Sequence, residues 1–341
     1  MVRKTSKLQT PLIDGNEAVF IWHGKEAPGL IGDFNHWEED DPLALKEVEP
    51  GVWALTIPFP ADAYIEYAYL QDGERTADPG NPHTVFNGVD AANHFFYMPD
   101  AKPTGLAQHR RGVPRGVLTR QIVEDEYNVV GRRRNVYFYQ PPVEEPCPLL
   151  VVFDGQDYLR RVGLTHMIDN LIYRKTIWPV ALAMVAHGGR ARSVEYACND
   201  ATLSFLHNRV LPAAQERLRL VDIRHSPGAY GVLGASMGGL MALYASLRLP
   251  HIFGKVLSQS GALFSGSVVY DLLRLNDPKP VKIWMDIGTY DSLFQVNKQM
   301  YSLLSSKGYD VTYREFHGGH NYPSWRDDVW RGLEALYGVQ Q

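Results

Sequence analysis

Cysteine is nearly missing from this chain, which has only Cys147 and Cys198 among 341 residues. Two such distant cysteines exclude a disulfide framework, a CxxC pair and a Cys-rich metal site. The 12 histidines show no HExxH or similar spacing. We therefore expect no catalytic metal and no other cofactor.

Long apolar runs and an excess of charge of one sign are also missing. No segment approaches the ~18 apolar residues that a membrane span needs, and the basic first nine residues lack the apolar stretch of a signal peptide. The 34 basic and 38 acidic residues leave a net charge of −4, whereas nucleic-acid binders are usually basic. We expect a cytoplasmic protein with no membrane and no nucleic-acid partner; a homodimer remains open.

The first part of the chain has the pattern of an all-β domain. At roughly 150 residues per domain, the length predicts two domains. Residues 11–98 contain short apolar runs separated by Gly, Pro and Asp clusters, and Asp72-Gly73 follows one run as a hairpin signal. This predicts an immunoglobulin-like β-sandwich over residues 1–98. The basic stretch 99–118 is broken by glycines and prolines and predicts a linker.

The remainder, residues 119–341, alternates between buried strands and helices. Strands are predicted at 135–139, 149–153, 180–185, 229–233, 255–258 and 281–287, and helices at 157–174, 201–218, 236–249, 292–307 and 324–337. Such alternation is typical of a mostly parallel sheet with helices on both faces. The predicted fold class of this domain is α/β.

The strongest motif is Gly234-Ala235-Ser236-Met237-Gly238. It fits Gly-x-Ser-x-Gly between a strand and a helix, which is the nucleophile elbow of an α/β-hydrolase. Glycines flank the serine because a Cβ there would strike the neighbouring strand or helix. The alternative is a plain glycine-rich turn; a phosphate-binding P-loop is excluded because no lysine follows. We interpret Ser236 as a nucleophile.

A serine nucleophile needs a base and an acid, which follow it in the order acid, then histidine. His320 lies in a glycine-rich loop before the last helix and is the predicted base; His317 is the alternative, and His251 is interpreted as structural. Asp291 lies in the loop at the carboxyl end of a strand, where ligand chemistry collects, whereas Asp286 lies within the strand. Asp291 is the predicted acid, and a helix N-cap is its alternative role.

An oxyanion hole is predicted from two backbone amides. One is that of Met237, directly after the nucleophile, and the other is that of Gln156, in the loop after the strand 149–153. An ordinary strand–helix turn is the alternative for the second loop.

Four further residues are candidates for substrate binding. Arg192 is one, although an ion pair with Glu195 is the alternative role for its side chain. The others are Tyr290, Tyr322 and Trp325, which surround the predicted triad in sequence but could equally be core aromatics.

These residues carry a family resemblance. Residues 119–339 resemble the enterochelin esterase and esterase D-type branch of α/β-hydrolases, through 153–156, Arg192 with Glu195, 234–239, 257–261, Gly288 with Asp291 and Asn297, and 318–320 with Trp325. The resemblance implies Ser236, Asp291 and His320 as nucleophile, acid and base. It also implies esters of catechol siderophores, or hydroxycinnamoyl or acetyl sugar esters, as substrates.

Residues 15–98 resemble a second family, the early-set β-sandwich of the isoamylase and glycogen-binding type. The match lies in Gly32-Asp33-Phe34-Asn35-His36-Trp37, Asp72-Gly73 and residues 78–82. Glycan-binding members use a tryptophan, a lysine and a second tryptophan. Trp37 fits the first position, but Ala68 and Arg75 stand at the other two, so weak or absent glycan binding is expected.

The sequence thus predicts a serine carboxylic ester hydrolase that acts on a small-molecule ester through an acyl-enzyme. Two alternatives remain. An acyltransferase would pass the acyl group to a sugar alcohol instead of water. A non-catalytic glycan-binding protein would carry an inactive hydrolase domain.

Overall fold

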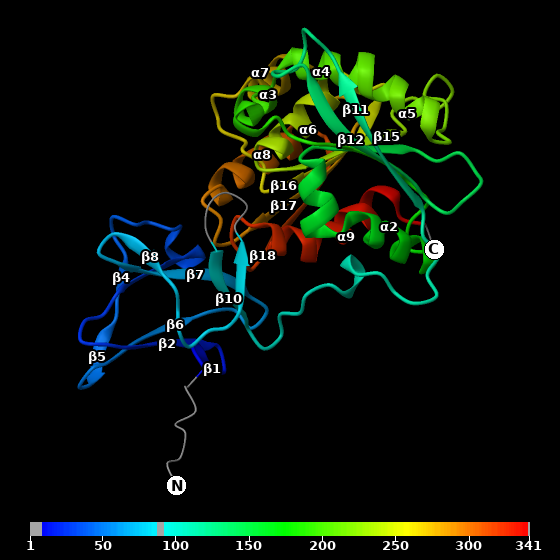
Figure 1. Ribbon diagram of the computed structural model, residues 1–341. Helices are drawn as coiled ribbons and strands as arrows, with labels where there is room; N and C mark the ends of the chain where they lie inside the picture. Colours follow the sequence, from blue (N-terminus) through cyan, green and yellow to red (C-terminus); the bar gives the residue numbers. More distant parts are fainter. Residues whose placement is uncertain (1–8, 87–91, 340–341) are drawn as a thin grey trace. The chain divides into compact units, whose positions relative to one another are not determined.

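The chain divides into two compact units, and each unit is built from segments that are not contiguous in sequence. The computed structural model describes residues 9–86 and 92–339 (Figure 1). One unit comprises residues 1–103, 288–292 and 315–324, and the other comprises 104–287, 293–314 and 325–341. Two short segments from the C-terminal half of the chain therefore belong to the unit built on the N-terminal strands.

The N-terminal unit contains two sheets whose paired strands are antiparallel. One sheet has the order β1-β2-β6-β5: β1 (Leu12–Asp14), β2 (Glu17–His23), β6 (Val52–Pro58) and β5 (Lys46–Glu49). The other has the order β4-β3-β7-β10-β9, with β8 beside β7: β4 (Leu43–Ala44), β3 (Gly29–Gly32), β7 (Tyr64–Gln71), β10 (Ala92–Tyr97), β9 (Thr84–Phe86) and β8 (Glu74–Thr76).

The two sheets share one aromatic core. Phe20 on β2 lies with its ring centroid 5.0 Å from that of Tyr67 on β7 and 5.9 Å from that of Phe96 on β10. These three side chains are buried, and edge-to-face aromatic pairs of this kind stabilise a core beyond the area that they bury. The sheets therefore pack face to face, while their assignment to the early-set class stays a prediction.

The second unit is built on an eight-stranded mixed sheet. Its order is β11-β12-β14-β13-β15-β16-β17-β18: β11 (Val117–Glu124), β12 (Arg133–Gln140), β14 (Ala181–Val185), β13 (Leu149–Val152), β15 (Tyr230–Ala235), β16 (Phe253–Gln259), β17 (Lys282–Gly288) and β18 (Asp310–Phe316). The pairs from β14 to β17 are parallel, whereas β11, β12 and β14 pair antiparallel.

Helices lie on both faces of this sheet. They are α1 (Gly155–Asp157), α2 (Leu164–Tyr173), α3 (Arg192–Tyr196), α4 (Asp200–Phe205), α5 (Leu211–Arg217), α6 (Met237–Arg248), α7 (Val268–Leu275), α8 (Phe294–Ser306) and α9 (Tyr322–Tyr337). Helix α6 packs on β15 and β16 on one face, and α2 and α9 lie on the other (Figure 1). Among the helices of residues 9–86 and 92–339, none has the length and hydropathy of a membrane span.

Two helices differ from the sequence prediction. A π-helical turn at 158–162 separates α1 from α2, and another at 206–210 separates α4 from α5. Pro212 is the second residue of α5, directly after the π-helical turn at 206–210, and as a proline it has no N–H to donate within this helical run.

Candidate active site

Ser236 lies on a sharp turn between β15 and α6. Its backbone has φ 56° and ψ −124°, a combination that side chains with a Cβ rarely adopt. A Cβ on Gly234 would overlap the backbone of Gly238, so the turn requires glycine at that position. The geometry presents the half-buried serine at the amino end of α6, where the helix dipole favours negative charge.

The loop with Gln156 leaves the same edge of the sheet as the loop with Ser236. Strands β13 and β15 are adjacent and parallel, so the turns that follow them emerge side by side. Gly155 approaches the backbone of Met184 so closely that a Cβ would overlap it. Among the described residues, no backbone acceptor occupies the N–H of Gln156 or Met237, as expected for the first turn of a helix.

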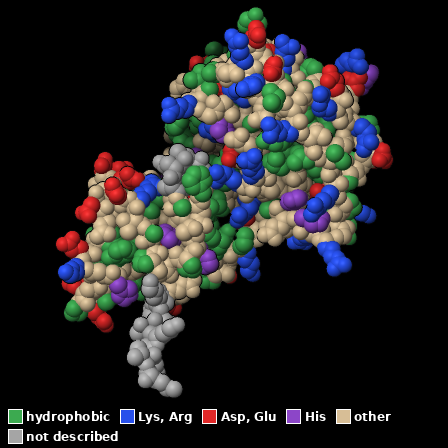
Figure 2. Space-filling view, viewed as in Figure 1, with side chains coloured by type: hydrophobic (Ala, Val, Ile, Leu, Met, Phe, Trp, Pro, Cys, Tyr) green, Lys and Arg blue, Asp and Glu red, His purple; other side chains and the backbone are tan. Residues whose placement is uncertain are grey.

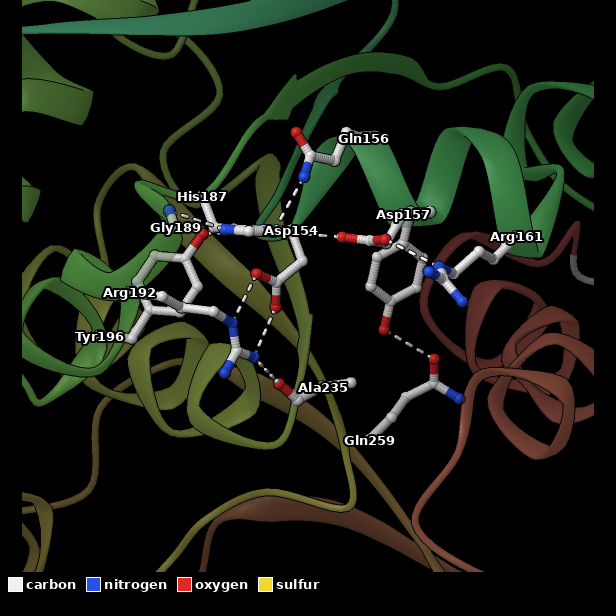
Figure 3. Close-up of polar contacts among 11 residues, drawn as sticks. Asp154, Gln156, Asp157, Arg161, His187, Gly189, Arg192, Tyr196, Ala235 and Gln259 are labelled. Atoms are coloured by element: carbon white, nitrogen blue, oxygen red, sulfur yellow. Dashed lines mark hydrogen bonds and ion pairs between the residues drawn. The ribbon is translucent and has the colours of Figure 1, made fainter. Parts of the chain in front are cut away.

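Arg192 joins these two turns (Figure 3). Its guanidinium donates to both carboxylate oxygens of Asp154, from Nε and Nη2 at 2.7 Å each, and Nη2 also donates to the carbonyl oxygen of Ala235 at 3.3 Å. Asp154 is fully buried. A bidentate Arg–carboxylate pair is geometrically specific, so it fixes the backbone before Gln156 relative to the backbone before Ser236.

The expected ion pair of Arg192 with Glu195 is therefore wrong. Glu195 pairs instead with Arg134 of β12 and accepts a hydrogen bond from the N–H of Val130 at 3.0 Å. Sequence analysis missed Asp154 as the partner, although Asp154 belongs to the Phe-Asp-Gly-Gln segment that resembles the esterase family.

The side chain of Gln156 has its own support. Its Nε2 lies 2.9 Å from Nε2 of His187, and Nδ1 of His187 accepts a hydrogen bond from the N–H of Gly189 at 2.9 Å (Figure 3). Because Nδ1 is the acceptor there, Nε2 of the neutral ring is a donor, and it pairs with Gln156 when the side-chain amide presents its oxygen to the ring. The loop after β14 thus helps to hold the turn that contains Gln156.

Asp291 and His320 form a hydrogen-bonded pair within the N-terminal unit. Nδ1 of His320 lies 2.8 Å from Oδ2 of Asp291. The carboxylate is buried at 1% exposure, and the imidazole is 35% exposed. A carboxylate on Nδ1 makes Nε2 the acceptor nitrogen of the neutral ring, which is the tautomer that a general base needs.

Backbone contacts tie the loops of Asp291 and His320 together. The N–H of Thr289 donates to the carbonyl of Phe316 at 2.8 Å, and the N–H of Tyr290 donates to that of Gly318 at 3.1 Å. A Cβ on Gly288 would overlap the carbonyl of Gly318. Only a glycine at 288 allows this approach, so the Asp–His distance is set by the backbone as well as by the side chains.

The competing acid and base have other partners. His317 Nδ1 lies 2.6 Å from a carboxylate oxygen of the exposed Asp62. Asp286 is fully buried in β17, where its Oδ2 accepts hydrogen bonds from Trp284 and Gln259 at 2.9 and 3.2 Å. Burial raises the pKa of Asp286 well above its usual range, which disfavours the charge that a triad acid must carry.

The three aromatic residues predicted to contact a substrate are divided between the two units. Tyr290 packs on Phe59 of the N-terminal unit with ring centroids 5.8 Å apart, and Tyr322 begins α9 half-buried. Trp325 is 4% exposed, and its indole N–H donates to Oγ of Ser260 at 2.9 Å. Contacts of these residues and of Arg192 with a substrate stay predictions. Within residues 9–86 and 92–339, no group of three or more His, Cys, Asp or Glu could hold a metal ion.

Comparisons with known proteins agree with this description. Residues 128–336 match the family model Esterase, described as "Putative esterase". The iron(III) salmochelin esterase of Escherichia coli O6:H1 is 25% identical over 98% of this chain and 93% of its own length. The iron(III) enterobactin esterase of Dickeya dadantii is 26% identical over 76% of this chain, and the match spans 64% of that relative's length.

A solved structure shares the fold. The crystal structure of ferric enterobactin esterase from Salmonella typhimurium matches with a TM-score of 0.78 at 21% identity, over 94% of this chain and 93% of that one. This likeness confirms the predicted α/β-hydrolase fold class. Since the family model covers more than half of the sequence, the chain belongs to the Esterase family.

Proposed function

We propose that this protein is a serine esterase that works through an acyl-enzyme, with Ser236 as nucleophile, His320 as base and Asp291 as acid. The observation that carries the proposal is the backbone of Ser236 at φ 56° and ψ −124°. Strained backbone of this kind persists at functional sites, where it holds a reactive group in place. The Asp291–His320 hydrogen bond of 2.8 Å supports the assignment of the other two roles.

In the proposed mechanism, Nε2 of His320 takes the proton of Ser236 as the hydroxyl oxygen attacks the ester carbonyl. Asp291 keeps Nδ1 protonated and stabilises the imidazolium that forms. The N–H groups of Met237 and Gln156 donate to the oxyanion, and each such donor contributes on the order of 3 kcal/mol to transition-state stabilisation. His320 then protonates the leaving alcohol and activates water for deacylation.

The proposed substrate is an ester bond of a catechol siderophore, with its bound iron counted as part of the substrate. Two relatives support this, one named for iron(III) salmochelin and one for iron(III) enterobactin. The salmochelin esterase match extends over 98% of this chain, so it includes the N-terminal unit as well as the hydrolase fold.

Active-site labelling and a substrate panel test the proposal. A fluorophosphonate should label one residue stoichiometrically, and the label should disappear in Ser236→Ala. The panel contains p-nitrophenyl acyl esters, ferric and iron-free catechol siderophores, and feruloyl sugars. The highest kcat/KM on a siderophore would support the substrate class; a preference for feruloyl or acetyl sugars would contradict it.

The same experiment separates the alternatives. A non-catalytic glycan-binding protein would not react with the fluorophosphonate. An acyltransferase would give a transfer product when a sugar alcohol is added, with a matching loss of the hydrolysis product. We expect labelling and no transfer product, because water is the proposed acceptor.

A further inference from the structure

Asp33 is a buried carboxylate at the start of the Gly32–Trp37 motif, in the 3-10 helix η1 (Asp33–Asn35) that follows β3. It is 2% exposed. Its Oδ2 accepts the backbone N–H of Glu66 at 2.9 Å, and its Oδ1 accepts the indole N–H of Trp37 at 3.0 Å. Burial, reinforced by the charge of Glu66, raises the pKa of Asp33 well above its usual range. Burying a carboxyl group costs free energy, so its place inside the unit indicates a specific role.

Both sequence neighbours of His320 lie against this carboxyl group. The Nδ2 of Asn321 donates to Oδ2 of Asp33 at 3.3 Å. On the other side, Gly319 packs so closely on Asp33 that a Cβ would overlap the carboxyl group. The backbone on each side of the histidine is thus fixed by the same side chain.

Asn321 connects this contact to the last helix. It directly precedes α9 (Tyr322–Tyr337), and its Oδ1 accepts the N–H of Ser324 at 3.0 Å, which is the bond of a helix N-cap. The side-chain amide therefore uses its oxygen for the helix and its nitrogen for Asp33.

The same motif reaches the loop of the acid. Nδ1 of His36 donates to the carbonyl of Tyr290 at 3.2 Å, and Tyr290 directly precedes Asp291. The motif therefore contacts both loops of the Asp291–His320 pair, and all of these residues belong to one compact unit.

The rest of the motif is engaged within the unit. The guanidinium of Arg75 covers the ring of Trp37 at 4.9 Å and pairs with Glu39 at 3.0 Å. Glu38, Glu39, Asp40 and Asp41 are exposed, and Figure 2 shows several acidic side chains on this unit. A tryptophan face covered by an arginine does not offer the open stacking platform that a sugar needs.

We propose that the Gly32–Trp37 motif positions the catalytic pair, with Asp33 as a positioning residue for His320. This inference rests on the proposed function, in which His320 is the general base. The sandwich motif that resembles a glycan-binding signature then serves catalysis by fixing the backbone of the base.

The test uses the full chain with two variants that change the contact without removing Asp33. Gly319→Ala inserts a Cβ into the carboxyl group, and Asn321→Ser keeps an N-cap oxygen but is too short to reach Asp33. We expect kcat on a p-nitrophenyl ester to fall about 100-fold in Gly319→Ala with KM nearly unchanged, because a misplacement of ~1 Å costs about this much. Asn321→Ser should lower kcat in the same way, by less.

Matched controls separate positioning from general destabilisation. Gly266→Ala adds a Cβ where nothing lies within 4 Å. Asp78→Asn alters another buried carboxylate of the same unit, which accepts from the hydroxyl of Tyr67 at 2.6 Å. Both should leave kcat unchanged. In a chain with Asp33→Ala, Gly319→Ala should cost nothing further, because the clash is gone. Equal losses of kcat in Gly319→Ala and its controls, or an additive double variant, would overturn the proposal.

A spectroscopic readout is independent of catalysis. The Nδ1 proton of His320, hydrogen-bonded to Asp291, should give a far-downfield proton NMR signal, assigned by its loss in His320→Gln. We expect Gly319→Ala and Asn321→Ser to weaken or shift this signal, and Gly266→Ala to leave it. If the wild-type chain cleaved no ester, the proposed function would fail while this signal still tested the positioning. An unchanged signal in both loop variants would contradict the inference.

Discussion

Asp291→Asn tests the assignment of the acid most directly. The substitution preserves the shape of the side chain but places an amide where a carboxylate oxygen now lies 2.8 Å from Nδ1 of His320. If the amide NH₂ faces the ring, Nδ1 becomes the acceptor and Nε2 carries the proton. The imidazole is then held in the tautomer that cannot accept a proton from Ser236.

The expected loss follows from charge and tautomer together. At 2.8 Å between the bonded atoms, the charge centres lie about 4 Å apart, where the attraction is about 4 kcal/mol. Water that reaches the imidazole, which is 35% exposed, lowers this to about 3 kcal/mol, or roughly a hundredfold in rate. Inversion of the tautomer brings the total loss of kcat to about 10⁴-fold, which is the loss known for a triad whose aspartate is replaced by asparagine.

The assay is kcat on a p-nitrophenyl acyl ester at saturation, with thermal unfolding measured to establish that the variant folds. Asp286→Asn is the matched control, because asparagine can accept the same hydrogen bonds from Trp284 and Gln259. It should cost less than about tenfold, as expected for one altered hydrogen bond. A greater loss in Asp286→Asn than in Asp291→Asn would transfer the acid role to Asp286.

Three further predictions follow from the site. Ser236→Ala should lower kcat by about 10⁶ and leave the fold intact; retention of more than a few per cent of activity would refute its role. Arg192→Lys should lower kcat by roughly tenfold to a hundredfold, because lysine cannot keep both bonds to a carboxylate. Arg209→Lys, which alters another arginine paired with a buried aspartate, should leave kcat unchanged; equal effects would refute the role of the first arginine. Because burial raises the pKa of Asp286 above 3.8 in the folded state, the wild type binds more protons folded than unfolded and loses stability as pH rises. The Tm of Asp286→Asn relative to wild type should therefore increase as the pH rises above about 4, and a constant difference would contradict this.

The sequence was most informative where chemistry and local pattern coincide. Ser236 could be found because the elbow needs small residues around a serine, between an apolar strand and a helix. Asp291 and His320 could be chosen because parallel strands carry their functional loops at one edge of the sheet. The hydrogen bond between their side chains is present in the structure, while their catalytic roles stay predictions.

Partnerships between distant segments could not be read in this way. Arg192 and Glu195 are three residues apart, which suggests a helical pair. Each bonds instead to a partner far away in sequence, Asp154 in the turn after β13 or Arg134 on β12. Strand β18 was missed for a related reason. It lies at the edge of the sheet with partly exposed residues, so it lacks the apolar run that identifies a buried strand.

The unit built on the N-terminal strands is assembled from three separate stretches of chain. Truncating the chain after residue 103 would therefore split one folded unit and would not separate two domains at a linker. It would leave the carbonyl of His317 without the N–H of Tyr64, 3.0 Å away, and the loop of His320 without Asp33. Transplanting this sandwich as a cassette between family members should succeed only if the segments 288–292 and 315–324 are inherited with it.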